Sequence, residues 1–112
     1  MELRDKMKSV IIIKLKDLDI PEFSRDDGKV IRGLIEQLWS QCDEILLDFQ
    51  DVEFLGISFI DEFYAKLFLS RSKEQILSKV KFLNLDEDYY SQMQSLASAR
   101  LKDKNRINEH SN

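Results

Sequence analysis

The sequence predicts an α/β fold in which helices pack on a small, mostly parallel or mixed sheet, in the order β-α-β-α-β-α. Three observations favour this class. Short apolar runs rich in β-branched residues are typical of strands. Between them lie longer segments whose apolar residues recur at helical spacing. The segments that join these elements are short, as expected where each helix connects two neighbouring parallel strands.

Length and composition indicate one domain. A chain of 112 residues with 43% hydrophobic residues can bury a core of its own, and we expect the domain to span residues 1–100. Residues 101–112 are almost entirely polar, which predicts a disordered C-terminal tail. The longest uninterrupted apolar run, Val10 to Ile13, is far too short for a membrane span. We therefore expect a soluble, cytoplasmic protein that does not contact membranes.

The charged, cysteine and histidine residues argue against several functions. A net charge of −4 provides no basic field for a phosphate backbone, so nucleic acid is not expected as a partner. The single cysteine, Cys42, excludes an intramolecular disulfide and a cysteine-based zinc cluster. The single histidine, His110, lies in the polar tail, so no Ser-His pair is expected in the core. We expect no metal, no cofactor and no enzymatic activity.

The first half of the chain predicts a strand followed by a helix. Val10 to Leu15 indicate a strand at about residues 9–16, and residues 17–23, with Pro21, read as a connection. Ser24 and Asp27 have the spacing of a helix start in which the serine side chain caps a backbone amide. The following apolar stripe comprises Val30, Ile31, Leu34, Ile35, Leu38 and Trp39, with Lys29, Arg32, Glu36 and Gln37 facing outward.

The second half predicts two more strands and two more helices. Ile45 to Phe49 is apolar at nearly every position, which predicts a central strand covered on both faces. The apolar spacing of residues 58–71 indicates a helix, and residues 80–85 a third strand. A last helix is expected from the acidic residues at 86–88 through Ala99. Its inward face is expected to consist of Tyr89, Met93 and Leu96, with Tyr90 and Ala97 as further candidates.

The most specific pattern follows the central strand and ends in Gly56-Ile57-Ser58-Phe59-Ile60-Asp61-Glu62-Phe63. It resembles the strand-to-helix signature of STAS domains, the anti-sigma-factor antagonist fold, where a phosphorylatable serine stands at the start of a helix. The sequence is more similar to a STAS-like family of unknown function, whose opening also matches Ser24-Arg25. This similarity covers about residues 9–99. Members of that family often occur with histidine-kinase-like ATPase domains, so the resemblance implies a regulatory module rather than an enzyme.

Two roles are weighed for Ser58, the hydroxyl residue of this pattern. As a helix N-cap it would form a Ser-x-x-Asp arrangement with Asp61. As a phosphate acceptor it matches only the second hydroxyl of the antagonist signature, because Gly56 and Ile57 occupy the preceding positions. Asp61 and Glu62 would repel a phosphate there, and no basic residue lies between Gln50 and Tyr64. We favour the cap over phosphorylation.

The other residues of the turn also have competing interpretations. Asp61 and Glu62 are favoured as an acidic first helical turn, although they could instead face a partner. Arg25 is expected to pair with these acids rather than to bind an anion, since successive βα connections open at the same end of the sheet. Gly56 is expected to serve a positive φ or a close backbone approach. The aromatic residues Phe59, Phe63 and Tyr64 are expected in the core, with the polar tip of Tyr64 or Tyr90 exposed.

These observations lead to two functional hypotheses. The first is a regulatory module that recognises a protein partner, such as a histidine-kinase-like ATPase or a similar signalling protein, through the turn from Phe54 to Glu62. Its site residues are Gly56, Ser58, Asp61, Glu62 and Arg25. The alternative is a small-ligand or nucleotide sensor that uses the same end of the sheet, for which Gly56 and Arg25 are the signals.

Overall fold

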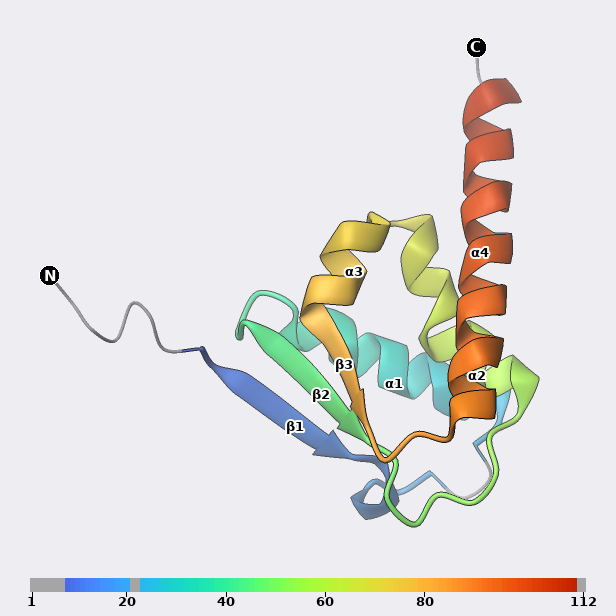
Figure 1. The fold of residues 1–112 in the computed structure, drawn as a ribbon. Helices are drawn as coiled ribbons and strands as arrows, with labels where there is room; N and C mark the ends of the chain where they lie inside the picture. The colour runs from blue at the N-terminus through green and yellow to red at the C-terminus, as the bar shows by residue number, and fades with distance from the viewer. Residues whose placement is uncertain (1–7, 21–22, 111–112) are drawn as a thin grey trace, which may run out of the picture.

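The structure, a computed structural model, describes residues 8–20 and 23–110, with side chains described to residue 106. It confirms the predicted α/β class (Figure 1). Its elements, in chain order, are β1 (Val10–Lys14), η2 (Leu15–Asp17), α1 (Arg25–Leu38), β2 (Glu44–Asp48), α2 (Ile57–Phe63), η3 (Ala65–Leu69), α3 (Lys73–Lys79), β3 (Val80–Leu83) and α4 (Glu87–His110). Among the described residues, no helix is both long and apolar enough to cross a membrane.

The three strands form one parallel sheet in the order β1-β2-β3, so β2 is central, as predicted. Ile13 is paired with Leu47, and Leu47 with Phe82. Residues paired in this way point to the same face of the sheet, and the next residue along each strand points to the opposite face. The face that carries Ile13, Ile45 and Leu47 is buried beneath the helices.

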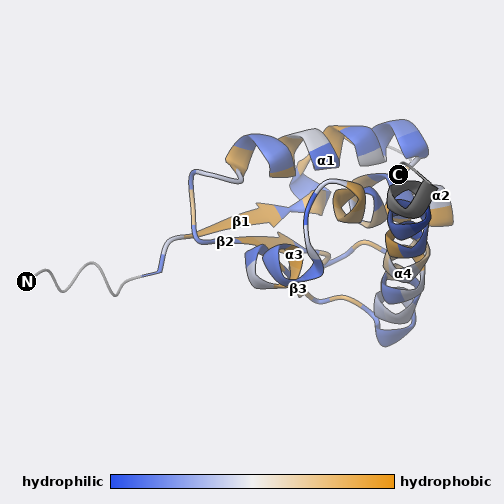
Figure 2. Ribbon diagram, turned by 90° about the horizontal axis from the view of Figure 1, so that it is seen from above, coloured by the Kyte–Doolittle hydropathy of each residue, from blue (hydrophilic) through white to orange (hydrophobic). Residues whose placement is uncertain are grey.

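Helix α1 lies on that face, and no described helix crosses the opposite face, which is turned toward the viewer in Figure 1. In Figure 1 the strands stand in front of α1, and Figure 2 places α1 along one side of β1 and β2. The prediction that β2 is covered on both faces is therefore wrong. Leu46 on the other face is only partly buried, and its neighbour Ile12 is 56% exposed. An apolar run identifies a strand but does not show whether a second layer covers it.

Helix α1 begins as predicted. The Ser24 hydroxyl accepts a hydrogen bond from the Asp27 amide, and the Asp27 carboxylate accepts one from the Ser24 amide. Ile31 and Ile35 are fully buried and hold the helix on the sheet. Val30, predicted as part of the same stripe, is 60% exposed because it lies at the margin of the buried face.

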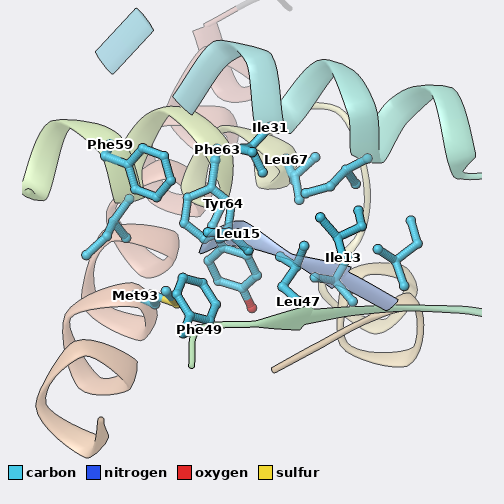
Figure 3. Close-up of a cluster of buried hydrophobic side chains, with 14 of the residues drawn as sticks. Ile13, Leu15, Ile31, Leu47, Phe49, Phe59, Phe63, Tyr64, Leu67 and Met93 are labelled. Carbon is cyan, nitrogen blue, oxygen red and sulfur yellow. The ribbon is translucent and has the colours of Figure 1, made fainter. Parts of the chain in front are cut away.

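The core contains the aromatic residues that the sequence placed there. Phe59, Phe63 and Tyr64 are buried, and Figure 3 shows them gathered between the sheet and α1 with Phe49 and Leu47. Adjacent rings lie at the distances of aromatic pairs, such as 5.1 Å between the centroids of Phe59 and Phe63. Of the two tyrosines predicted to expose a polar tip, Tyr90 is exposed and Tyr64 is buried.

Two predictions for the second half are wrong, and one helix was not predicted. The helix expected at residues 58–71 consists of α2 and the 3-10 helix η3, joined at Tyr64. Helix α3 was not predicted, although Ser72 and Gln75 form a capping box at its start. The tail expected to be disordered from residue 101 continues α4 to His110, while residues 111–112 lie outside the described chain.

Candidate functional site

The turn between β2 and α2 presents two large apolar side chains to solvent. Phe54 is 68% exposed and Ile57 is 62% exposed. We call these two residues the turn patch. They border an open hollow of about 690 Å³, which Arg25, Ser58 and Tyr89 also line. The Tyr89 hydroxyl accepts a hydrogen bond of 3.2 Å from the Leu55 amide, so α4 holds the turn in place.

The structure changes the interpretation of Gly56 and Ser58. Helix α2 starts at Ile57, its N-cap residue is Gly56, and Ser58 is an exposed residue of its first turn. The predicted Ser58 cap is therefore wrong, because the helix begins earlier than the Ser-x-x-Asp spacing suggested. Gly56 has a φ of −74°, and an added Cβ would stand 3.8 Å from the Phe54 ring, an ordinary contact distance. The predictions of a positive φ and of a close approach are also wrong.

Substitution of Ser58 by alanine tests this assignment. Because Ser58 caps no amide, Ser58→Ala is expected to change the free energy of unfolding by less than about 0.5 kcal/mol. Ser24→Ala, which removes a true cap, is expected to cost about 1 kcal/mol. Urea unfolding of both variants measures the difference. Equal losses in the two variants would restore the capping role of Ser58.

Glu62 lies at the centre of an ion-pair network beneath the turn. Its side chain is fully buried and accepts hydrogen bonds from three basic side chains. The distances are 2.8 Å from Arg25 Nη1 to Oε1, 2.6 Å from Arg32 Nη1 to Oε2, and 3.0 Å from Lys66 Nζ to Oε1. Burial alone would raise the pKa of Glu62, but the hydrogen bonds from Lys66, Arg32 and Arg25 lower it to about 2.

Asp61 connects the same network to the last helix. Arg100 of α4 donates to both carboxylate oxygens, at 2.9 Å from Nε and 2.5 Å from Nη2. Arg25 approaches the same carboxylate at 3.5 Å. The hydrogen bonds from Arg100, opposed by burial, lower the pKa of Asp61. Asp61 therefore stays ionised and links α4 to α2 and α1.

The two carboxylates thus meet four basic side chains from three segments of the chain. The predicted pairing of Arg25 with the turn acids is confirmed. The favoured interpretation of Asp61 and Glu62 as acids of the first turn is wrong, since both lie beyond it and are buried. Arg32 was expected to face outward, and Lys66 and Arg100 were not predicted as site residues. Only the Glu62–Lys66 pair could have been predicted from the local sequence, because residues spaced i,i+4 are neighbours on a helix.

The sequence of the chain matches a known protein family. Residues 27–90, more than half of the chain, match a family described as a STAS-like domain of unknown function (DUF4325). The chain belongs to this family. The resemblance predicted from the turn is therefore confirmed, and the match includes most of α1, the turn and β3. Searches of curated proteins and of solved structures gave no match.

Near the turn, this STAS-like domain has few side chains that are free to react or to bind a metal ion. Within the described part of the chain, no group of three or more histidine, cysteine, aspartate or glutamate side chains could hold a metal ion. Asp61 and Glu62 are committed to internal ion pairs, whereas Ser58 and the turn patch are open to solvent. The exposed features of the site are therefore suited to contact with another molecule.

Proposed function

We propose that this STAS-like domain is a non-enzymatic regulatory module that binds a protein partner through the turn patch. The observation that carries the proposal is the exposure of Phe54 and Ile57 side by side at the turn after the central strand. Large apolar side chains gathered at one exposed place commonly mark interaction sites. An aromatic anchor at the middle of an interface also contributes a large share of binding energy.

Arg25 supplies the polar border of this surface. It is partly exposed, and its guanidinium is held by Glu62 at 2.8 Å. A planar guanidinium has several donors, so Arg25 retains some for a carboxylate of the partner. Its fixed position lowers the entropy lost when such a contact forms. In this proposal Asp61 and Glu62 act indirectly, by positioning Arg25 rather than by touching the partner.

The proposed class of partner is a histidine-kinase-like ATPase. This part of the proposal follows from the resemblance to the STAS-like family of unknown function, whose members often occur with histidine-kinase-like ATPase domains. The buried state of Asp61 and Glu62 supports binding over acid-base catalysis, because neither carboxylate is free to reach a substrate.

Phosphorylation of Ser58 stays a prediction. Its exposure is compatible with modification, and the acids that were expected to repel a phosphate are neutralised by basic residues.

The hollow beside the turn patch favours a second candidate function, a small-ligand or nucleotide sensor. Its volume of about 690 Å³ lies within the range of small-molecule sites. Phe23 and Tyr89 provide aromatic surface, and Arg25 provides a positive charge. Such a ligand would occupy the surface that the first proposal assigns to the partner.

The double variant Phe54→Ser/Ile57→Ser tests the first proposal. Binding to a purified histidine-kinase-like ATPase domain from the same organism is expected to weaken at least about 10-fold for each lost anchor. Isothermal titration calorimetry measures this loss. The matched control is Val30→Ser, which removes an equally exposed apolar side chain from α1. Thermal unfolding should remain unchanged in all variants because these side chains are exposed.

Two outcomes would contradict the protein-partner proposal. The first is equal weakening of binding in the control and in the double variant, which would move the interface elsewhere. The second is tight binding of a nucleotide, seen as a thermal shift that Arg25→Ala removes, with no binding of the ATPase. That result would support the sensor function instead.

A further inference from the structure

The free edge of β3 borders a second pocket, which the proposed function does not use. β3 is an outer strand of the sheet, and in Figure 1 α4 lies beyond it. The pocket has a volume of about 540 Å³ and is open to solvent. It shares no lining residue with the hollow beside the turn patch. We call it the edge pocket, and its walls include Tyr64, Leu77, Lys81, Phe82, Glu87 and Tyr90.

The edge pocket runs along the backbone of β3. Its walls include Phe82 from one face of the strand and Lys81 from the other, so the pocket reaches around the edge. In a parallel sheet, alternate residues of a strand bond to the neighbouring strand. The Leu83 carbonyl accepts a hydrogen bond of 2.9 Å from the Phe49 amide, which places Leu83 and Lys81 in the bonded set. The N–H and C=O groups of Phe82 therefore point away from β2, toward the free edge.

These two backbone groups of Phe82 have no partner in the described part of the chain. No turn, loop or cap hydrogen bond of the described residues involves either of them. Phe82 is half-buried, and backbone groups in such places are ordinarily paired with protein or with ordered water. One donor and one acceptor therefore lie side by side at the edge pocket, ready to bond to a molecule that enters it.

The free edge is too short for an added peptide strand. At one end, the Val80 amide already donates to the Ile76 carbonyl in the last turn of α3. At the other end, Asn84 has a φ of 57°, so the chain leaves the extended conformation directly after Leu83. An added strand bonds to a row of alternate residues, whereas here only Phe82 has both backbone groups free. The edge therefore favours a compact ligand over a peptide.

The walls of the edge pocket favour a flat and neutral ligand. The ring of Phe82 lies 5.3 Å from that of Tyr64 and 6.3 Å from that of Tyr90, measured between centroids. Tyr90 is 45% exposed, so its ring is available to a planar molecule. Lys81 and Glu87 are both exposed and have opposite charges, so the lining does not select an ion of either sign. The volume lies within the range of small-molecule sites.

We propose that the edge pocket binds a small, neutral, planar molecule that carries an N–H and a C=O group side by side, as a cyclic amide does. The ligand carbonyl accepts a hydrogen bond from the Phe82 amide, and the ligand N–H donates one to the Phe82 carbonyl. Two residues of paired antiparallel strands exchange hydrogen bonds in the same way. The ring of the ligand packs against Tyr90. The inference does not depend on the function proposed for the turn.

A matched pair of compounds tests the proposal. The probe is 2-quinolinone, a planar bicyclic cyclic amide, and its control is N-methyl-2-quinolinone, which keeps the ring but lacks the N–H donor. Two-dimensional ¹⁵N NMR of the full chain is expected to show saturable shifts in β3 and at the start of α4 with the probe. The Phe82 amide signal should move furthest downfield, because this amide gains a hydrogen bond. The N-methyl compound should bind at least about 10-fold more weakly.

Two variants separate this site from the turn patch and from misfolding. Tyr90→Ala should weaken binding of 2-quinolinone at least about 5-fold, and its NMR spectrum should show an intact fold because Tyr90 is exposed. Phe54→Ser should leave the binding unchanged. The proposal is overturned if the two compounds bind equally, if 2-quinolinone causes no saturable shifts, or if the shifts map to the hollow beside the turn patch. Unchanged affinity in Tyr90→Ala would overturn it as well.

Discussion

Glu62→Gln is expected to lower the free energy of unfolding by about 3 kcal/mol, measured by urea unfolding at pH 7. The substitution conserves the shape of the side chain but removes its charge. Arg25, Arg32 and Lys66 then face a neutral amide whose NH₂ group can accept nothing from them. The three basic groups stay partly exposed and regain some hydration, so the loss falls at the lower end of the range for a broken buried pair.

The matched control for this prediction is Glu36→Gln. Glu36 also makes a short ion pair, at 2.6 Å with Arg71, but its side chain is exposed. Exposed pairs contribute little because water competes for both charges, so the expected loss is below about 1 kcal/mol. If Glu62→Gln destabilised the domain no more than Glu36→Gln, the buried network would not be a major source of stability.

The pH dependence of stability provides a second measure of the same network. The pKa of Glu62 is about 2 in the folded state, below its ordinary value of 4.5, so ionised Glu62 stabilises the fold above about pH 4.5. This contribution is lost as the pH falls from about 4.5 towards 2. Wild type should therefore lose its advantage over Glu62→Gln across that range. A constant difference between the two proteins from pH 6 to pH 2.5 would contradict the low pKa.

The sequence could predict only part of this network. Arg25 was paired with the turn acids because the loops that follow parallel strands meet at one end of a sheet. Arg32 and Arg100 are 30 and 39 residues from their acidic partners, and polar residues on a helix ordinarily face solvent. Only the packing of α1 and α4 against α2 brings them to Glu62 and Asp61. Local patterns contain no information about such contacts.

The fold was predictable where local signals and tertiary packing agreed. The three strands and α1 follow from apolar periodicity, and the cap at Ser24 from its spacing to Asp27. The segment at residues 58–71 is apolar on nearly every side, so periodicity could not reveal the change from α2 to η3 at Tyr64. The signal for α3, Ser72 followed by Gln75, was present but had few apolar residues to support it.

Gly28→Ala is expected to lower the free energy of unfolding by about 2 kcal/mol. Gly28 lies where α1 crosses α2, and an added Cβ would stand 2.8 Å from Glu62 Cβ and 2.8 Å from the Phe59 carbonyl oxygen. Backbone atoms cannot move aside without separating the two helices. Separation would also lengthen the ion pairs of Arg25 and Arg32 with Glu62. The gain in helix propensity, about 1 kcal/mol, only partly offsets this strain.

Gly33→Ala is the matched control, in the same helix and of the same chemical change. Apart from its chain neighbours and the backbone of its own helix, no atom lies within 4 Å of the position of its added Cβ, so only the propensity gain of about 1 kcal/mol remains. The two variants should therefore differ by about 3 kcal/mol and with opposite signs in urea unfolding. A stabilised Gly28→Ala would mean that α1 and α2 can separate freely. In that case the close helix contact would not be what brings Arg25 and Arg32 onto Glu62.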